Sequence, residues 1–331
     1  MSEPLRVGIF GAGAIGGFVG GRLAASGCDV TLVGRPRVLD PIRANGLVLE
    51  DLDGRTRRAS TLRCATEPTA LRDCDVVIVT TKAAGTREAA IAVRDHTRAD
   101  VPVVSLQNGV EGPVILKEIL GAGRGFGGMI AYNVVFRDAS TLRRATSGPI
   151  VIERGVPRLM DALRAADLEA HDTDEIARVL WSKMLFNLNN ALNALSGLPL
   201  RTQLRDRGYR RLMATMMREG MAVMRAQGMR PMRFGMLYPP LAALVLPSPD
   251  FVFERAAAAM LKIDPEARSS MADDLAQRRP TEIDALNGVV VRRGRELGVA
   301  TPRNEKVVAA IRRAEEANAG SPHLSPDAIL G

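Results

Sequence analysis

A glycine-rich turn between two apolar runs constrains the fold of this chain more than any other feature. Residues 6–10 form a short apolar run, and residues 11–16, Gly-Ala-Gly-Ala-Ile-Gly, follow without a gap. Helical spacing then covers residues 17–26, and a second apolar run covers residues 29–33. The pattern predicts a strand, a tight turn, a helix and a second, parallel strand.

The spacing of the three glycines becomes specific in this strand–turn–helix context, although it is weak evidence alone. Gly11 permits the turn, Gly13 lets backbone approach a pyrophosphate, and Gly16 lets the helix pack close to the sheet. The N–H groups at the start of the helix then face the anion. An ordinary glycine-rich turn is the alternative. The segment predicted to bind a dinucleotide comprises Gly11, Ala12, Gly13, Ala14, Ile15 and Gly16.

The end of the second predicted strand indicates which dinucleotide is bound. NAD-binding proteins place an acidic residue there, about 20 residues beyond the glycines, on the ribose 2′-hydroxyl. This chain has Arg35 and Arg37 instead. A guanidinium suits a 2′-phosphate, so we predict NADPH/NADP, held by Arg35 in preference to Arg37. The alternative is that Arg35 is merely solvated.

Strand and helix signals alternate through the first half of the chain, which implies a parallel sheet with helices on both faces. From Asp174 the pattern is helical. We predict an α/β fold: a Rossmann-type doubly wound parallel sheet over residues 1–173, an all-helical substrate and catalytic domain over residues 174–318, and a loose tail over residues 319–331. The further strands are expected at 75–80, 101–107, 127–136 and 149–153, and the further helices at 86–94 and 158–167.

Composition excludes several classes of protein. Hydrophobic residues make up 46% and charged residues 25% of the 331 residues, which excludes a disordered or fibrous chain. No membrane span or signal peptide is expected. Cys28, Cys64 and Cys74 form no C-x-x-C pair and favour reduced thiols in a cytoplasmic protein; no metal site is predicted. Eight of the 14 Met residues fall between Met213 and Met236, at a spacing that suits a buried helix face or a subunit interface.

The net charge of +8 does not indicate a nucleic-acid partner. Of the 45 basic residues, 40 are Arg and five are Lys, and they are dispersed along the chain. A nucleic-acid-binding protein clusters its basic residues, usually among aromatics, which are only 4% here. Because Lys can release its proton and Arg cannot, each Lys in such a chain is a candidate for chemistry.

One predicted helix carries a polar stripe on an apolar background. At about 100° per residue, Lys183, Asn187 and Asn190 fall within about 60° of one another. A buried Lys has a lowered pKa and can act as an acid at neutral pH. A structural hydrogen-bond network or a solvated face is the alternative.

Three other positions are candidates for the same site. Glu282 shares an apolar helical stripe with Leu286, although Thr281 and Asp284 could form a plain capping box. Asn108 and Lys82 each follow a predicted strand, at the edge where open α/β sheets bind ligands, with an ordinary turn or surface role as the alternative.

Together these motifs resemble the ketopantoate reductase family, and they occur in the family's order between residue 6 and about residue 315. The matching segments are Gly11–Gly16, Thr81-Lys82-Ala83, Gln107-Asn108-Gly109, Trp181-Ser-Lys183 with Asn187, Ser269-Ser270-Met271, and Thr281–Asp284 with Asn287-Gly288. The resemblance implies two domains with the active site in the cleft between them. It also implies NADPH-dependent reduction of ketopantoate to (R)-pantoate, toward pantothenate and coenzyme A.

The resemblance assigns a role to individual positions. Lys183 matches the proton donor, and Glu282 matches an acid that touches cofactor and substrate. Asn187 and Ser270 match residues that bind the substrate, and Asn108 matches an Asn near nicotinamide and substrate. Lys82 falls within a cofactor-binding segment.

One departure from the family bears on the substrate. The family often has a second Asn eight residues after the Lys, where this chain has Ala191, with Asn190 displaced by one position. We therefore expect a small 2-oxo acid as substrate, with ketopantoate first and another 2-oxo or imino acid as the alternative. A dinucleotide sensor without turnover is the rival from another class, and the oligomeric state, a homodimer included, is open.

Overall fold

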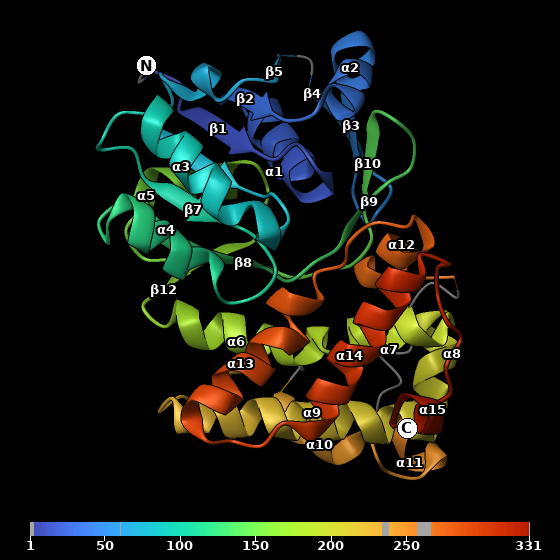
Figure 1. The fold of residues 1–331 in the computed structure, drawn as a ribbon. Coiled ribbons are helices and arrows are strands. Elements are labelled where there is room, and N and C mark those ends of the chain that lie inside the picture. The colour runs from blue at the N-terminus through green and yellow to red at the C-terminus, as the bar shows by residue number, and fades with distance from the viewer. Residues whose placement is uncertain (1–2, 60, 234–237, 257–265, 331) are drawn as a thin grey trace. The chain divides into compact units, whose positions relative to one another are not determined.

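The computed structural model describes residues 3–59, 61–233, 238–256 and 266–330. The chain divides into two compact units, Met1–Leu180 and Trp181–Gly331. The first is α/β and the second helical (Figure 1), which confirms the predicted fold class. The division falls inside helix α6 (Ile176–Asn187), whereas the sequence pattern changes at Asp174. The domain limits 1–173 and 174–318 therefore stay predictions.

An eight-stranded sheet forms the centre of the first unit, in the order β12-β11-β8-β7-β6-β1-β2-β5. Neighbouring strands are parallel except β11 and β8, which are antiparallel. The predicted strands at 29–33, 75–80 and 101–107 are confirmed. The bounds are β1 (Arg6–Phe10), β2 (Asp29–Val33), β5 (Arg63–Ala65), β6 (Val76–Val79), β7 (Val103–Ser105), β8 (Gly125–Ile130), β11 (Ile150–Glu153) and β12 (Ala170–Thr173).

Helices cover both faces of this sheet, as the expected doubly wound fold requires. Strand β6 is buried throughout because its alternate side chains enter two separate cores. Val76 and Ile78 pack in the core that α1 and α5 share, while Val77 and Val79 pack in the core of α3 and α4. The helices of this unit are α1 (Ala14–Ala25), α2 (Pro36–Asn45), α3 (Thr86–His96), α4 (Gly112–Leu120) and α5 (Pro157–Ala165), with short 3-10 turns η1 (Pro68–Leu71) and η2 (Ala83–Gly85).

A second, four-stranded sheet was not expected. It has the order β4-β3-β10-β9, and it packs on α1, where a Cβ at Gly17 would lie 2.7 Å from Leu142 Cδ1. The single strand predicted over residues 127–136 is therefore wrong, because its end leaves the main sheet and joins this one. The bounds are β3 (Leu47–Glu50), β4 (Thr56–Ala59), β9 (Val134–Phe136) and β10 (Thr141–Arg144).

The described part of the second unit is helical, without a strand. Met213, Met216, Met217 and Met224 are buried in its longest helix, α9, which confirms core packing for these four. Met236 lies outside the described residues. The remaining elements are α7 (Asn189–Ser196), α8 (Leu200–Arg205), α9 (Arg207–Ala226), α10 (Pro239–Val245), α11 (Asp250–Ala256), α12 (Ser270–Ala276), η3 (Ile283–Ala285), α13 (Asn287–Leu297), α14 (Pro302–Ala317) and α15 (Pro326–Leu330).

A buried carboxylate fixes the start of α14. Glu219 on α9 accepts hydrogen bonds from the backbone N–H groups of Arg303 (2.9 Å) and Asn304 (3.0 Å), and from the Asn304 side chain (2.7 Å). The first N–H groups of a helix have no partner within it, and they attract negative charge. Glu219 therefore satisfies these donors and locks α14 onto α9.

The C-terminal segment is packed rather than loose, so the predicted tail over residues 319–331 is wrong for the described part, 319–330. The Leu324 N–H donates to Leu195 O (2.9 Å), and the Tyr209 hydroxyl donates to Leu324 O (2.6 Å). Gly197 lies so close to His323 that a Cβ at Gly197 would be 2.4 Å from its Nδ1. Tertiary contacts thus order a segment whose composition suggests a flexible end.

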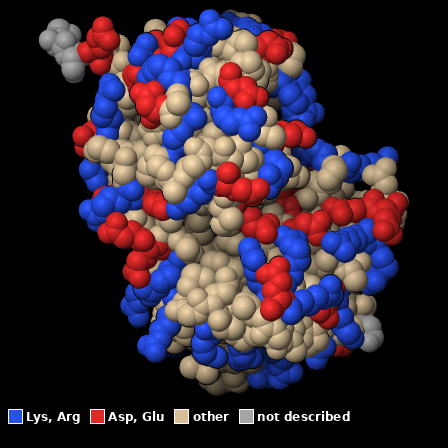
Figure 2. Space-filling view, turned by 60° about the vertical axis from the view of Figure 1, so that its left-hand side comes forward, with Lys and Arg blue, Asp and Glu red and all other residues tan. Residues whose placement is uncertain are grey.

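Acidic and basic side chains are interspersed over the face shown in Figure 2. Several of the basic residues pair with carboxylates, among them Arg6 with Asp75 and Arg22 with Asp51. This arrangement agrees with the dispersed Arg residues of the sequence. No described helix has both the length and the apolar character needed to cross a membrane.

Candidate active site

The glycine-rich turn has the geometry that its spacing predicts. Gly11 has φ +114°, and a Cβ there would lie 2.7 Å from the Thr81 nitrogen. A Cβ at Gly16 would lie 2.2 Å from Gly11 O and 2.3 Å from Thr80 Oγ1, whereas a Cβ at Gly13 would meet no atom within 4 Å. Gly11 and Gly16 are thus required by packing, and Gly13 leaves open space above the backbone.

The start of α1 is suited to a bound anion. Gly13 is its N-cap, no side chain caps it, and no acidic residue lies in its first turn. Ala14 and Ile15 form that turn and are partly buried, and Ala12 is buried against Gly34 at the end of β2. The uncapped N–H groups and the helix dipole can together hold phosphate oxygens.

Arg35 and Arg37 follow β2, and both are exposed. Arg35 is the N-cap residue of α2 and has extended backbone. Among the described residues, neither guanidinium forms an ion pair, unlike many Arg residues of this chain. Both are therefore available to an external anion.

A buried amide joins the loops after β6 and β7, and sequence patterns gave it no role. Gln107 Nε2 donates to Thr81 O (2.9 Å) and Thr86 Oγ1 (2.9 Å), and Gln107 Oε1 accepts from Ser105 Oγ (2.9 Å). The adjoining residues Lys82, which is exposed, and Asn108, which is partly buried, are consequently held at one edge of the sheet. Gln107 belongs to the Gln-Asn-Gly motif, so its position next to the candidate Asn108 was the sequence feature that could have indicated its role.

The polar stripe in the second unit is present. Lys183 and Asn187 lie on α6 and Asn190 on α7, and all three are partly buried, whereas the adjacent Met184 and Leu188 are buried. The helix is interrupted at Leu188, but this residue keeps right-handed helical angles and donates to Met184 O (3.0 Å). The chain direction therefore continues, and the predicted face is preserved across the break.

The asparagines off this stripe have a different task. Asn189 and Asn193 are buried and share Gln203, whose Nε2 donates to Asn189 Oδ1 (2.9 Å) and whose Oε1 accepts from Asn193 Nδ2 (3.2 Å). This network fixes α7 against α8. Asn189 and Asn193 therefore have a structural role.

Ser270 and its neighbour Ser269 differ in their surroundings. Ser269 is buried, caps α12 by accepting from the Ala272 N–H (3.2 Å), and donates from Oγ to Asn190 O (3.1 Å). Ser270 is exposed and is the first residue of α12. The structure therefore places Ser270 one residue from a contact to Asn190.

Glu282 does not lie on a helical stripe, and that prediction is wrong. It precedes the 3-10 turn η3, and Leu286, with φ −111° and ψ −95°, separates this turn from α13. The alternative capping box is also absent, because the Thr281 N–H donates to Glu315 Oε1 (2.7 Å) and the Asp284 carboxylate pairs with Arg312. Glu282 therefore precedes a short turn, and its neighbours Thr281 and Asp284 are held by contacts from α14.

The Lys183 amine interacts electrostatically with the Glu282 carboxylate. Burial lowers the pKa of Lys183 to about 8, and the nearby Glu282 carboxylate opposes that shift by favouring the charged amine. The amine is consequently charged at neutral pH but gives up its proton more readily than a solvated Lys. No group of three or more His, Cys, Asp or Glu among the described residues is placed to hold a metal ion.

Comparison with known proteins agrees with these features. The family model "Ketopantoate reductase PanE/ApbA" matches residues 7–156, and its C-terminal counterpart matches residues 175–315. A 2-dehydropantoate 2-reductase of Mesorhizobium japonicum is 32% identical over 93% of this chain and 97% of its own length.

The chain belongs to the PanE/ApbA family of ketopantoate reductases. A solved ketopantoate reductase of this family from Ralstonia eutropha is 31% identical and has a TM-score of 0.82. The match covers 95% of this chain and 99% of that protein's chain. D-mandelate dehydrogenase, solved with NADH and anilino(oxo)acetate, shares the fold at a TM-score of 0.79 and 22% identity, over 95% of this chain and 99% of its own. The protein is thus an oxidoreductase, and the family uses a nicotinamide cofactor.

Substitution of the glycines of this family motif separates packing from ligand approach. We expect Gly16→Ala to lower stability by about 1–3 kcal/mol because its methyl group overlaps backbone. Gly13→Ala should unfold at the wild-type temperature and yet bind the reduced nicotinamide cofactor about tenfold or more weakly, since its methyl group fills the open space. Thermal unfolding without cofactor and fluorescence titrations with NADH and NADPH measure both. Equal melting temperatures for the two variants would contradict this assignment.

Proposed function

We propose that this protein reduces 2-dehydropantoate (ketopantoate) to (R)-pantoate with NADPH, a step toward pantothenate and coenzyme A. The observation that carries the proposal is the pair formed by Lys183 and Glu282, in which a partly buried amine of lowered pKa stands beside a carboxylate. Such a pair suits proton donation to a carbonyl oxygen as negative charge develops on it. Membership of the ketopantoate reductase family supports the substrate.

The first unit fits a dinucleotide, as its uncapped helix start and the open space at Gly13 indicate. We assign the pyrophosphate to the backbone of residues 11–16, the 2′-phosphate to Arg35, and the nicotinamide end to Lys82 and Asn108. Glu282 is assigned to cofactor and substrate alike. When bound, NADPH supplies the hydride that the keto carbon receives.

Lys183 has the central chemical role in this proposal. Charged before the reaction, its ammonium group hydrogen-bonds the substrate's carbonyl oxygen and transfers a proton to that oxygen as it becomes an alkoxide. The interaction strengthens as charge builds up, which raises turnover rather than ground-state binding alone. Arg could not replace Lys183, because a guanidinium keeps its proton.

The remaining candidate residues bind and orient the substrate. Asn187 and Asn190 offer neutral donors and acceptors along the same face as Lys183, and Ser270 helps to receive the carboxylate. Glu282 holds the Lys183 ammonium in place and keeps it charged. A fixed geometry of this kind raises the reaction rate, because the reacting groups are already oriented when the substrate is bound.

Removal of the Lys183 amine tests the mechanism. Lys183→Ala should lower kcat for ketopantoate reduction by about 10²–10⁴-fold, with NADPH binding nearly intact, because only the proton donor is lost. Lys183→Arg should show a similar loss of kcat, because a guanidinium keeps its proton. The wild-type rate of reduction should fall as pH rises through about 8, where the amine loses its proton. Steady-state NADPH oxidation across pH provides both measurements, and near-normal turnover by Lys183→Ala would remove Lys183 from this role.

Reversal of one charge tests the choice of NADPH. Arg35→Asp should raise KM for NADPH by about 10- to 100-fold, because a charge-assisted hydrogen bond to the 2′-phosphate is lost. KM for NADH, which lacks that phosphate, should change far less. Arg37→Asp is the matched control, and an equal rise in both KM values for Arg35→Asp would refute the assignment.

A second candidate substrate is favoured by Ala191. This residue occupies the family's usual second Asn position and is fully buried, so no polar group stands there to meet a distal hydroxyl. A 2-oxo acid without that hydroxyl is the alternative, such as oxo(phenyl)acetate, the 2-oxo acid that corresponds to mandelate.

A substrate panel decides between the two candidates. NADPH oxidation should be fastest with ketopantoate, measured beside oxo(phenyl)acetate and branched-chain 2-oxo acids. A kcat/KM at least about tenfold higher for another 2-oxo acid would select the alternative, since that ratio corresponds to about 1.4 kcal/mol of transition-state binding. Asn190→Ala, assayed on the same panel, shows whether the displaced Asn contributes to the preference.

A further inference from the structure

The position of Glu282 depends on tertiary contacts rather than on regular secondary structure. Glu282 lies between Pro280 and the 3-10 turn η3, and it is partly buried. A short turn has few hydrogen bonds of its own, so its geometry is set by what it packs against. Helix α14 supplies a hydrogen bond and an ion pair to this segment, and Arg292 of α13 adds a hydrogen bond to the Asp284 carbonyl.

Helix α14 holds the chain on both sides of Glu282. Before it, the Thr281 N–H donates to Glu315 Oε1 at 2.7 Å, and after it, Asp284 Oδ1 pairs with Arg312 Nη2 at 2.7 Å. Arg312 and Glu315 are three residues apart and therefore share a face of the helix. The two contacts therefore lie on either side of Glu282 in the chain.

Of these two contacts, the one from Glu315 is the more consequential. Both partners of the Arg312 pair are more than half exposed, and exposed ion pairs contribute little. The Thr281 bond joins a carboxylate to a backbone N–H and is partly buried, so losing the acceptor leaves that N–H without its partner.

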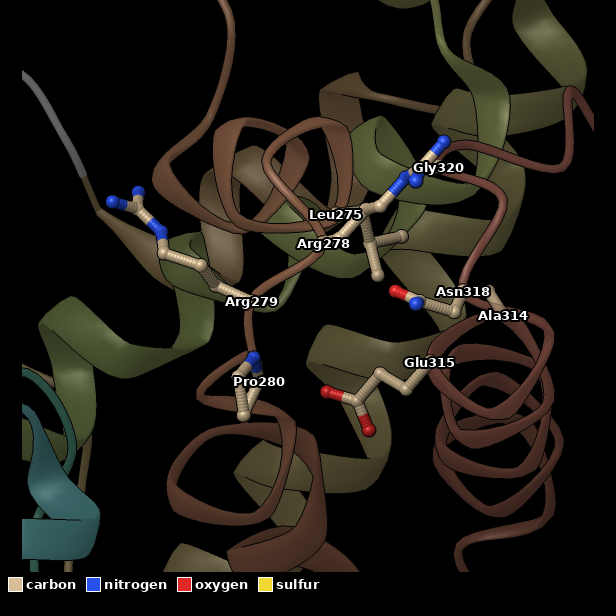
Figure 3. Close-up of a pocket in the computed structure, with 8 residues that line it drawn as sticks. All are labelled: Leu275, Arg278, Arg279, Pro280, Ala314, Glu315, Asn318 and Gly320. Atoms are coloured by element: carbon tan, nitrogen blue, oxygen red, sulfur yellow. The ribbon is translucent and has the colours of Figure 1, made fainter.

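A pocket of about 210 Å³ lies beside the hydrogen bond between Thr281 and Glu315, and it leaves space for this segment to move. Figure 3 shows Glu315 reaching from α14 toward Pro280, while Arg279 points away from it. Leu275 and Ala314 line the same pocket. If the carboxylate is removed, the segment that carries Glu282 can shift into this space, because no side chain fills it.

We propose that Glu315 is a positioning residue, which holds Thr281 and thereby keeps the Glu282 carboxylate beside Lys183. The proposal rests on the proposed function of Lys183 and Glu282. Buried Glu219 fixes the start of the same helix, α14. The charged groups around the segment are Glu282, Asp284 with Arg312, Arg292 on the Asp284 carbonyl, and Arg278 and Arg279 at the pocket.

The test compares three variants of α14. Glu315→Ala removes the acceptor, Glu315→Gln keeps an amide oxygen that can still accept from Thr281, and Glu316→Ala removes a neighbouring exposed carboxylate of the same helix. Glu315→Ala should lower kcat by about 10- to 100-fold, as a small displacement of a catalytic group does. Glu315→Gln and Glu316→Ala should remain close to wild type.

The alkaline limb of the pH–rate profile separates positioning from plain stability. The Glu282 carboxylate raises the pKa of Lys183, so its displacement in Glu315→Ala should move that limb to lower pH. The limb should stay in place for Glu315→Gln and Glu316→Ala. An unmoved limb in Glu315→Ala, or an equal movement in Glu316→Ala, overturns the proposal.

Amide hydrogen exchange provides a readout that needs no turnover. A peptide covering residues 279–286 should exchange faster in Glu315→Ala than in wild type, Glu315→Gln or Glu316→Ala. Unchanged exchange overturns the positioning role even if the enzyme is active. If the wild type reduces no 2-oxo acid, the proposed function fails, and exchange still decides whether Glu315 holds the segment.

Discussion

The close packing of α1 on β1 at Gly16 is the constraint on which the first unit depends. A Cβ at this position would overlap the Gly11 carbonyl and the Thr80 hydroxyl, so helix, turn and the end of β6 all meet at one point without a side chain. The Thr80 hydroxyl donates to Gly11 O at 2.6 Å and closes this meeting point. The start of α1 is thereby fixed at the carboxyl edge of the sheet, where a phosphate can reach its N–H groups.

The two units support their candidate residues by different means. In the first, the backbone forms the proposed anion site, and the buried Gln107 amide holds the neighbouring loops by hydrogen bonds to Thr81 and Thr86. In the second, side chains are proposed to carry the chemistry, so their placement depends on partners far away in the sequence. Thr281, next to Glu282, is bonded to Glu315 on α14, and the start of α14 is bonded to Glu219.

Local patterns predicted what local interactions determine. Spacings within a few turns of chain were enough to predict the β1-α1-β2 unit and the stripe of Lys183 and Asn187. The absence of an acidic residue after β2 could also be read from the sequence. The small sheet escaped detection because β4 is Thr-Arg-Arg-Ala, and β3 pairs with β10, some ninety residues later. The helical stripe predicted for Glu282 is wrong because Leu286 separates the turn η3 from α13 and so interrupts the helical spacing.

The packed C-terminus has a consequence for the order in which this chain folds. All strands of the first unit are complete at Thr173, so that unit can fold as soon as it leaves the ribosome. In the second unit, the Leu324 N–H donates to Leu195 O at the end of α7, and the Tyr209 hydroxyl on α9 donates to Leu324 O. Helix α7, which carries Asn190, and helix α9 therefore acquire these contacts only after residues up to Leu324 have left the ribosome.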